Sequence, residues 1–335
     1  MTLKVISEKY LGDESARLRF VREARAAASV RHPNVASVYH LGRSGRDYFY
    51  AMEFVEGETL ESFIKRSGLL EIKLALEITS QVASGLAGIA KQKLVHRDIK
   101  PSNILVSLEE GGAVTAKIID LGLAKPTTGA PGEATISTPG GFAGTPEFAS
   151  PEQFAGVGID IRSDLYSLGA TLWDMLTGQV PFRGSVGEVM YAHQQARLPL
   201  EQLRNVPQPV VVLLEALLQK DPARRIRDPA EVLKAMSAVR SAIELGRAIT
   251  KESLQAIPVA DSRAATHRWP ARLAPERISI ARLPVTASSV FGREEDIGFS
   301  GCCLGKRGGK RCYYCCLGWC WEVHAGQPLA PKDGC

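Results

Sequence analysis

The chain has 335 residues, 45% of them hydrophobic, and a formal net charge of +5. This length suffices for one two-lobed domain with an extension, and the composition is ordinary for a soluble globular protein. The apolar runs are far shorter than a membrane span, and the N-terminus lacks the layout of a signal peptide. We therefore expect a cytoplasmic protein that neither enters a membrane nor binds nucleic acid, since its modest positive charge is spread over solvated helix faces.

The first predicted elements are a short strand and a helix. Residues 3–6 (LKVI) have the composition of a strand and carry one lysine, Lys4. Residues 13–30 have apolar or alanine side chains at helical spacing, and acidic residues suited to a first turn. This predicted helix contains Glu23.

Two further strands are predicted at residues 35–41 and 48–54, joined by a turn that contains glycine. The second strand runs into the sequence Met-Glu-Phe-Val-Glu-Gly at residues 52–57.

Two polar segments then follow between short apolar strands. Residues 96–103 read His-Arg-Asp-Ile-Lys-Pro-Ser-Asn, and a second acidic triplet, Asp-Leu-Gly, begins at Asp120. Phosphoryl transfer needs a carboxylate that orients a hydroxyl and accepts its proton, and hard oxygen ligands for metal ions. A lone aspartate or asparagine in a loop is usually a cap or a turn residue. Here several polar residues recur at a fixed spacing between short predicted strands, which argues against that interpretation.

These segments resemble the catalytic loop and the magnesium-binding triplet of bacterial eukaryotic-like (Hanks-type) serine/threonine protein kinases. The resemblance extends from about residue 2 to about residue 246. It implies an α+β fold with a small β lobe and a larger helical lobe. It also implies transfer of the ATP γ-phosphoryl group to serine or threonine in protein substrates, with Mg²⁺ or Mn²⁺, and autophosphorylation.

The resemblance assigns roles within both polar segments. Asp98 matches the catalytic base, and Lys100 matches a γ-phosphate contact that is typical of serine/threonine kinases. Asn103 and Asp120 match the metal ligands. Arg97 matches the residue that pairs with a phosphate on the activation loop.

The resemblance also implies the nucleotide contacts. Residues 52–57 resemble the hinge between kinase lobes, so that Met52 is the gatekeeper behind the adenine. The backbone groups of Glu53 and Val55 would hydrogen-bond the base, and Leu105 would be the apolar floor beneath it.

Lys4 matches the kinase lysine that pairs with the α- and β-phosphates, and Glu23 matches the helix glutamate that ion-pairs with this lysine. The alternative for Glu23 is a surface salt bridge on an arginine-rich helix. A kinase normally has two strands and a glycine-rich turn before this lysine, and the chain starts too late to contain them.

We therefore expect a small lobe that lacks its first two strands and has an exposed sheet edge. One explanation is an incomplete gene product with a misassigned start, which the complete downstream catalytic set favours. The other is a natural variant that acts as a catalytically weak or inactive scaffold or signalling input module.

Residues 125–144 are rich in threonine, glycine and proline and are predicted to form a mobile loop. The resemblance identifies them as an activation loop, with an unmodified linker as the alternative. The predicted regulatory residues are Thr135, Ser137, Thr138 and Thr145.

Two further matches are structural. Asp164 matches the buried aspartate that holds the backbone of the catalytic loop, and Arg225 matches the arginine that pairs with Glu152. A buried ion pair of this kind is costly to break from one side.

The last part of the chain differs in character. We predict a kinase domain at 1–246, a linker at 247–290 and a disordered cysteine-rich tail at 291–335, since all seven cysteines lie beyond residue 301. Residues 291–297 resemble the opening of a P-loop ATPase domain. Reading the coding DNA of the tail one base later permits a glycine-rich turn with Lys-Ser-Thr, so we interpret the tail as a frameshifted remnant of such a domain, which full-length relatives would carry. The alternative is a zinc site at Cys312 and Cys315.

Overall fold

The computed structural model describes residues 2–6, 21, 24–44, 47–108, 111–120, 145–156, 158–250 and 253–254, and the backbone of four short strands between residues 302 and 332. The chain divides into two compact units: Met1–Leu41 with Phe49–Trp269, and Gly42–Tyr48 with Pro270–Cys335. Among the described helices, none combines the length and hydrophobicity that crossing a bilayer requires.

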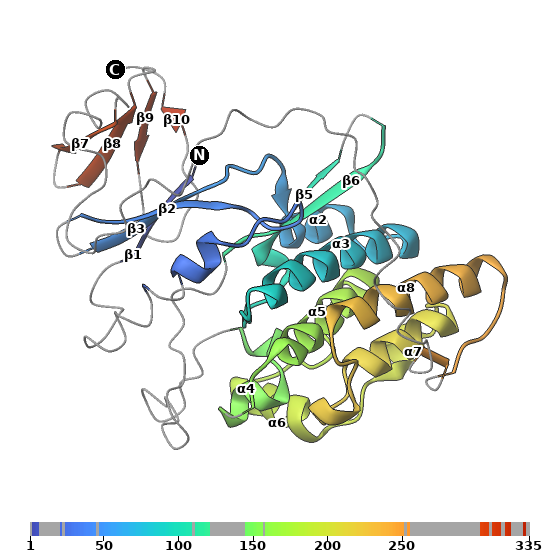
Figure 1. Cartoon of the computed structure of the whole chain (residues 1–335). Coiled ribbons are helices and arrows are strands. Elements are labelled where there is room, and N and C mark those ends of the chain that lie inside the picture. The colour runs from blue at the N-terminus through green and yellow to red at the C-terminus, as the bar shows by residue number, and fades with distance from the viewer. Residues whose placement is uncertain are drawn as a thin grey trace. The chain divides into compact units, whose positions relative to one another are not determined.

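The N-terminal part of the chain forms a three-stranded sheet (Figure 1). Its strands are β1 (Thr2–Ile6), β2 (Val38–Ser44) and β3 (Asp47–Met52), in the order β1-β3-β2. The end of β3 is buried, whereas Leu3 and Val5 on the edge strand β1 are partly exposed. Residues 24–28 are helical, in agreement with the helix predicted around them.

A second, antiparallel sheet packs against a long helix. It contains β4 (Glu58–Thr59), β5 (Ile104–Leu108) and β6 (Val114–Ile118), in the order β4-β5-β6. Helix α3 (Ile72–Lys91) contacts β6. This close approach requires Gly85, because a Cβ atom there would lie 2.9 Å from both the Asn34 carbonyl oxygen and Ile118 Cδ1.

The helical part is built around α5 (Ile161–Thr177), which is buried along most of its length. A helix that is buried on every side is a core helix. Helices α3 and α7 (Gln208–Leu217) contact α5 directly (Figure 1). Helix α8 (Pro229–Glu244) packs against both α3 and α7.

The remaining elements are short. They are α2 (Leu60–Ser67), α4 (Pro151–Ala155), α6 (Val186–Gln195) and the 3₁₀ helices η2 (Pro101–Asn103), η3 (Pro146–Phe148), η4 (Leu200–Leu203) and η5 (Pro222–Arg224). This arrangement confirms the predicted α+β fold, with a small sheet followed by a larger helical part.

Four short strands are described in the tail, which the sequence predicts to be disordered. Its described residues form β7 (Cys302–Arg307), β8 (Lys310–Cys315), β9 (Trp319–Glu322) and β10 (Pro331–Lys332), in the sheet order β10-β9-β8-β7. Tyrosine and tryptophan have high strand propensity, which favours strands β8 and β9; β7 and β10 contain neither residue. The P-loop, frameshift and zinc interpretations of this tail stay predictions.

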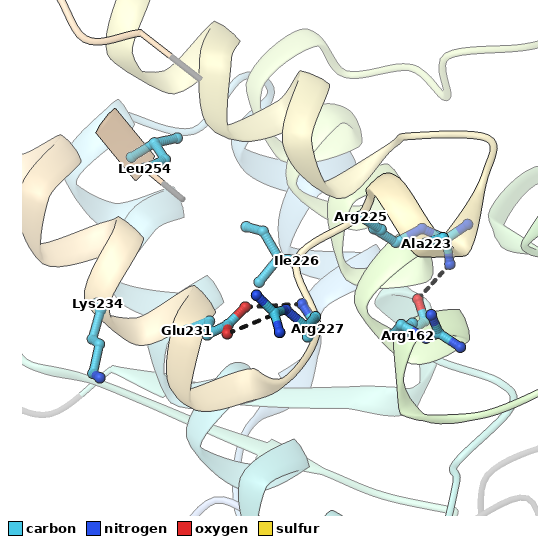
Figure 2. Close-up of a pocket in the computed structure, with 8 residues that line it drawn as sticks. All are labelled: Arg162, Ala223, Arg225, Ile226, Arg227, Glu231, Lys234 and Leu254. Atoms are coloured by element: carbon cyan, nitrogen blue, oxygen red, sulfur yellow. Dashed lines mark hydrogen bonds and ion pairs between the residues drawn. The ribbon is translucent and has the colours of Figure 1, made fainter. Parts of the chain in front are cut away.

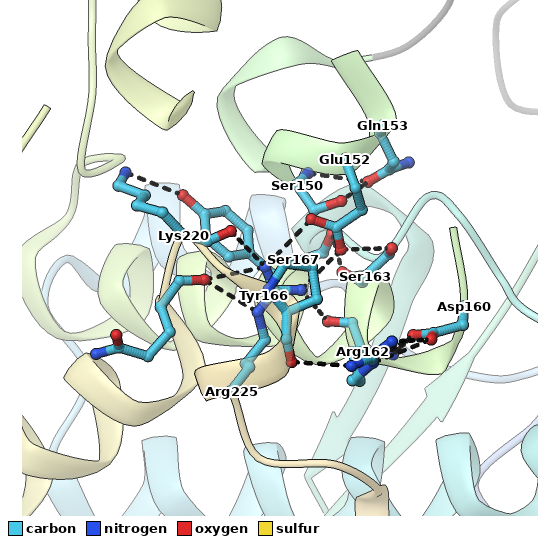
Figure 3. Close-up of polar contacts among 12 residues, drawn as sticks. Ser150, Glu152, Gln153, Asp160, Arg162, Ser163, Tyr166, Ser167, Lys220 and Arg225 are labelled. Carbon is cyan, nitrogen blue, oxygen red and sulfur yellow. Dashed lines mark hydrogen bonds and ion pairs between the residues drawn. The ribbon is translucent and has the colours of Figure 1, made fainter. Parts of the chain in front are cut away.

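A buried ion pair joins α4 to the segment before α8 (Figure 3). Arg225 Nη1 lies 2.7 Å from Glu152 Oε1, and the two side chains are 0% and 7% exposed. Ser163 donates to the same oxygen at 2.6 Å, and Arg225 also donates to the carbonyl oxygens of Arg162 and Gln219. Although burial alone would raise it, hydrogen bonding and charge from Arg225 hold the pKa of Glu152 below its ordinary value.

Glu152→Ala should lower the free energy of unfolding by about 3–5 kcal/mol, because it leaves the buried Arg225 charge uncompensated. Glu61→Ala is the control, since Glu61 pairs with Lys65 on the surface of α2, and its loss should cost less than about 0.5 kcal/mol. Urea unfolding measures both values. Similar losses in the two variants would contradict the assigned importance of the buried pair.

Candidate active site

The backbone of residues 96–103 is held by one buried carboxylate. Asp164, on α5, accepts the backbone N–H groups of His96 and Arg97, each at 2.7 Å. Arg97 has a φ of 65°, a left-handed conformation that costs a non-glycine residue about 1–2 kcal/mol. The two hydrogen bonds to the Asp164 carboxyl group offset that cost. Burial raises the pKa of Asp164 to about 7, while the two backbone donors oppose the rise.

The same loop is tied to the chain just before Asp120. His96 Nε2 lies 3.1 Å from the Ile119 carbonyl oxygen, and the Ile119 N–H donates to the Asn103 carbonyl oxygen at 2.9 Å. Asp120 itself has a φ of 56°. These hydrogen bonds fix the position of Asp120 relative to residues 96–103.

The Asp98 carboxylate is oriented by two donors. Asn103 Nδ2 donates to Asp98 Oδ2 at 2.9 Å and to the Asp98 carbonyl oxygen at 2.8 Å. Lys100 Nζ lies 3.2 Å from the same Oδ2 and donates to Thr145 Oγ1 at 2.7 Å. The structure thus brings together four residues that the sequence predicts for the site.

A second cluster forms around Asp120. Lys4 Nζ lies 2.6 Å from Asp120 Oδ2, and the Tyr50 hydroxyl donates to Asp120 Oδ1 at 3.2 Å. Burial, and then the charge of Asp120, raise the pKa of Tyr50, which therefore stays protonated as a donor. The side chains of Lys4 and Asp120 are 41% and 29% exposed, so this ion pair is accessible to a ligand.

Two oxygen groups of the site have the chemistry of divalent-metal ligands. The Nδ2 end of Asn103 is engaged by Asp98, which leaves its amide oxygen as the coordinating end. Asp120 supplies a carboxylate. Such hard oxygen ligands suit Mg²⁺ or Mn²⁺, so the donor set fits the predicted metal.

The segment after β3 is fixed against both sheets. The Glu53 N–H donates to the Ser37 carbonyl oxygen at 2.8 Å, and the Glu53 carboxylate accepts the Ser37 N–H and pairs with Lys117 on β6. Gly57 has a φ of 126°, and a Cβ atom there would lie 2.3 Å from the Val106 carbonyl oxygen. Any larger residue at Gly57 would separate this segment from β5.

The predicted base-binding residues lie around this segment. Met52 is buried at the end of β3, and Val55 is half-buried. Leu105 pairs with Lys117 in the sheet register and so lies on the face from which Lys117 reaches Glu53. Because the Glu53 N–H is already bonded to Ser37, its carbonyl oxygen is the Glu53 backbone group left for a ligand.

Some predicted site residues lie outside the described residues. They are Glu23, Thr135, Ser137 and Thr138. Their predicted roles stay predictions. Three residues of the site, Tyr50, Ser37 and Lys117, were not predicted from the sequence. For Ser37 and Lys117 the available signal was their alternation with buried neighbours, whereas Tyr50 lies in a continuous buried run.

A separate cavity of about 420 Å³ contains none of the predicted site residues (Figure 2). Its lining is basic, but the three arginines each have a carboxylate partner: Arg162 with Asp160, Arg225 with Glu152, and Arg227 with Glu231. The three arginines are therefore compensated, and Lys234 is the other basic residue of the lining.

Comparison with known proteins identifies the architecture. The family model of the protein kinase domain matches residues 1–237. The serine/threonine-protein kinase PrkC of Bacillus subtilis is 37% identical over 238 residues, which are 70% of this chain and 35% of PrkC. The serine/threonine-protein kinase PknA of Mycobacterium tuberculosis is 36% identical over 247 residues, which are 72% of this chain and 55% of PknA.

The chain therefore spans 35% to 55% of the length of these curated relatives. The crystal structure of the Mycobacterium tuberculosis PknI kinase domain has the same fold, with a TM-score of 0.56 and 25% identity. The match covers 71% of this chain and 84% of that one.

Asp164→Asn tests the buried anchor through its pH dependence. Folded Asp164 holds a proton up to about pH 7, whereas the unfolded chain releases it near the ordinary pKa of 3.8. The stabilisation that comes from Asp164 is therefore full below that ordinary pKa and is lost as the pH rises through 7. We expect the free energy of unfolding of the wild type minus that of the variant to fall by more than about 1 kcal/mol between about pH 5 and about pH 8.

Asp160→Asn is the matched control on the same helix. Burial opposes the effect, but Arg162 holds the pKa of Asp160 below its ordinary value of 3.8. Its contribution is lost only as the pH falls below that range, so the corresponding difference should be flat between about pH 5 and about pH 8. Urea unfolding at each pH gives both differences, and a flat profile for Asp164→Asn would refute the raised pKa.

Proposed function

The chain belongs to the protein kinase domain family, and we propose that it transfers the γ-phosphoryl group of ATP to serine or threonine hydroxyls of proteins. The observation that carries this proposal is the orientation of the Asp98 carboxylate by Asn103 and Lys100 within one anchored loop. A general base must be held in place before it can act on a bound hydroxyl.

Asp98 is the proposed base. A protein hydroxyl becomes a better nucleophile as it passes its proton to a carboxylate, which Asp98 would provide. Lys100 is 3.2 Å from that carboxylate, so its positive charge also serves a phosphate bound beside Asp98. Thr145, which accepts a hydrogen bond from Lys100, would lie next to the entering substrate chain.

Asn103 and Asp120 are the proposed ligands of Mg²⁺ or Mn²⁺. When bound, the cation neutralises charge on the phosphate oxygens of ATP. The protein's contribution is to hold both ligands in place, through the Asp98 contacts of Asn103 and the Tyr50 hydroxyl on Asp120.

The nucleotide base would bind at the segment after β3. Met52 and Leu105 supply apolar surface, and the Glu53 carbonyl oxygen and the Val55 backbone supply hydrogen-bonding groups. Lys4 would contact the α- and β-phosphates, and Glu23 would pair with Lys4 in that state.

Regulation is proposed to act through the activation loop. Autophosphorylation at Thr135, Ser137 or Thr138 would place a phosphate that Arg97 can pair with. Protein substrates are the proposed partners, and a P-loop ATPase domain is the proposed neighbour in full-length relatives.

Asp98→Asn should reduce label transfer from radiolabelled ATP to a generic basic protein by at least about 100-fold, because the amide cannot accept the proton. Asp221→Asn is the control, since Asp221 is an exposed cap of η5, and its activity should match the wild type. Chelating divalent ions with EDTA should abolish transfer by the wild type, and Mg²⁺ or Mn²⁺ should restore it. Equal transfer by Asp98→Asn and the wild type would remove the proposal.

A further inference from the structure

His193, on α6, is a fully buried polar residue that the proposed reaction does not use. Three aromatic rings surround its imidazole, those of Phe154, Tyr166 and Phe182, with centroids 5.9, 5.6 and 5.0 Å away. Both ring nitrogens have partners inside this enclosure. Nδ1 lies 2.8 Å from the Tyr166 hydroxyl, and Nε2 lies 3.1 Å from the Glu147 carbonyl oxygen.

The hydrogen bonds through His193 can run in only one direction. The Glu147 carbonyl oxygen only accepts, so Nε2 carries the hydrogen and a neutral ring accepts at Nδ1. Tyr166 must then donate to Nδ1, and its oxygen accepts from Lys220 Nζ at 3.5 Å. Lys220 has donors only, so the order Lys220 to Tyr166 to His193 to Glu147 cannot reverse.

Burial and the neighbouring charges maintain that state at neutral pH. Burial, and then the charge of Lys220, lower the pKa of His193 to about 3. Burial, and then Arg225, lower the pKa of Lys220 to about 8, and its ammonium lies 4.4 Å from the Phe182 ring centroid. Near pH 7 the imidazole is therefore neutral and the lysine is mainly charged.

The acceptor at the end of this chain belongs to η3, beside Asp98. Thr145 immediately precedes η3 and is bound by Lys100 at 2.7 Å, and Lys100 in turn contacts Asp98. Residues 145–148 are thus held at two points: by the catalytic loop through Thr145, and by α6 through the Glu147 carbonyl oxygen.

We propose that His193 is a positioning residue for the protein substrate, because it fixes the backbone of η3 beside Asp98 without touching the nucleotide-binding residues. This inference rests on the proposed function and adds to it the determinant of substrate-chain placement. His193 takes no part in proton transfer, since its partners are a backbone carbonyl and a tyrosine inside the core.

The kinetic test separates the two substrates. His193→Phe keeps an aromatic ring but removes both hydrogen bonds of the imidazole. It should raise KM for a generic basic protein about tenfold, which corresponds to the loss of the one buried hydrogen bond to Glu147. KM for ATP should stay within about twofold, because the nucleotide contacts are untouched. Tyr166→Phe is the matched control, since it leaves the Nε2 bond to Glu147 in place and should have the smaller effect.

Two further variants, His193→Gln and His193→Asn, test the proposal even if His193→Phe does not fold. The amide nitrogen of Gln can stand near the Nε2 position and reach Glu147, whereas that of Asn stands near Nδ1 and cannot. His193→Gln should therefore keep KM for the protein close to wild type, and His193→Asn should raise it. Equal KM values in this pair, or equal changes in KM for ATP and for protein, would overturn the proposal.

Amide hydrogen exchange gives a readout that needs no activity. Exchange at residues 147–149 should be at least about tenfold faster in His193→Asn than in His193→Gln, with α5 unchanged in both. If the wild type transfers no phosphate, the proposed function fails while this comparison still judges the positioning role. Unchanged exchange at residues 147–149 would refute that role.

Discussion

The burial of residues 163–173 of α5 is the constraint on which the proposed active site depends. Polar side chains on a helix without access to water must find partners within the protein. Ser163 reaches Glu152 on α4, Asp164 reaches the backbone of the catalytic loop, and Tyr166 reaches His193 on α6. Within two turns, one rigid helix therefore fixes three segments that are distant in sequence. Direct contacts add to this arrangement, since Gln153 on α4 donates to the Arg97 carbonyl oxygen and the Phe154 ring lies against His193.

Backbone strain is located where the chemistry is proposed. Arg97 and Asp120 are non-glycine residues with φ of 65° and 56°. Such conformations persist only where the surroundings determine them strongly. Asp164 supplies that constraint at Arg97, and the bonds between Ile119, His96 and Asn103 supply it next to Asp120. The polar groups of the site are thus oriented before any ligand binds, and these hydrogen bonds offset the free energy of the backbone strain.

The sequence predicted the fold class, because the spaced motif at residues 96–103 and 120–122 is typical of one family with one fold. The roles of the residues in that motif stay predictions. The sequence also predicted the Asp164 and Arg225 contacts, which depend on the same resemblance. It did not predict that Tyr50 would reach Asp120 or that Lys117 would reach Glu53, because such cross-sheet contacts depend on strand register. The tail strands were missed for another reason: strand propensity there is not accompanied by alternation of apolar and polar residues.

Lys4 and Asp120 satisfy one another at 2.6 Å, although the proposed function assigns them to different ligands, a phosphate and a divalent cation. A pair this exposed is worth about 1 kcal/mol or less, so either ligand can replace it. A cation on Asp120 would release Lys4 to bind a phosphate, and a phosphate on Lys4 would release Asp120 to bind a cation. Each ligand removes the competitor of the other, and linkage makes the two effects equal in free energy. Metal and nucleotide would therefore bind to this site cooperatively, each increasing the affinity for the other.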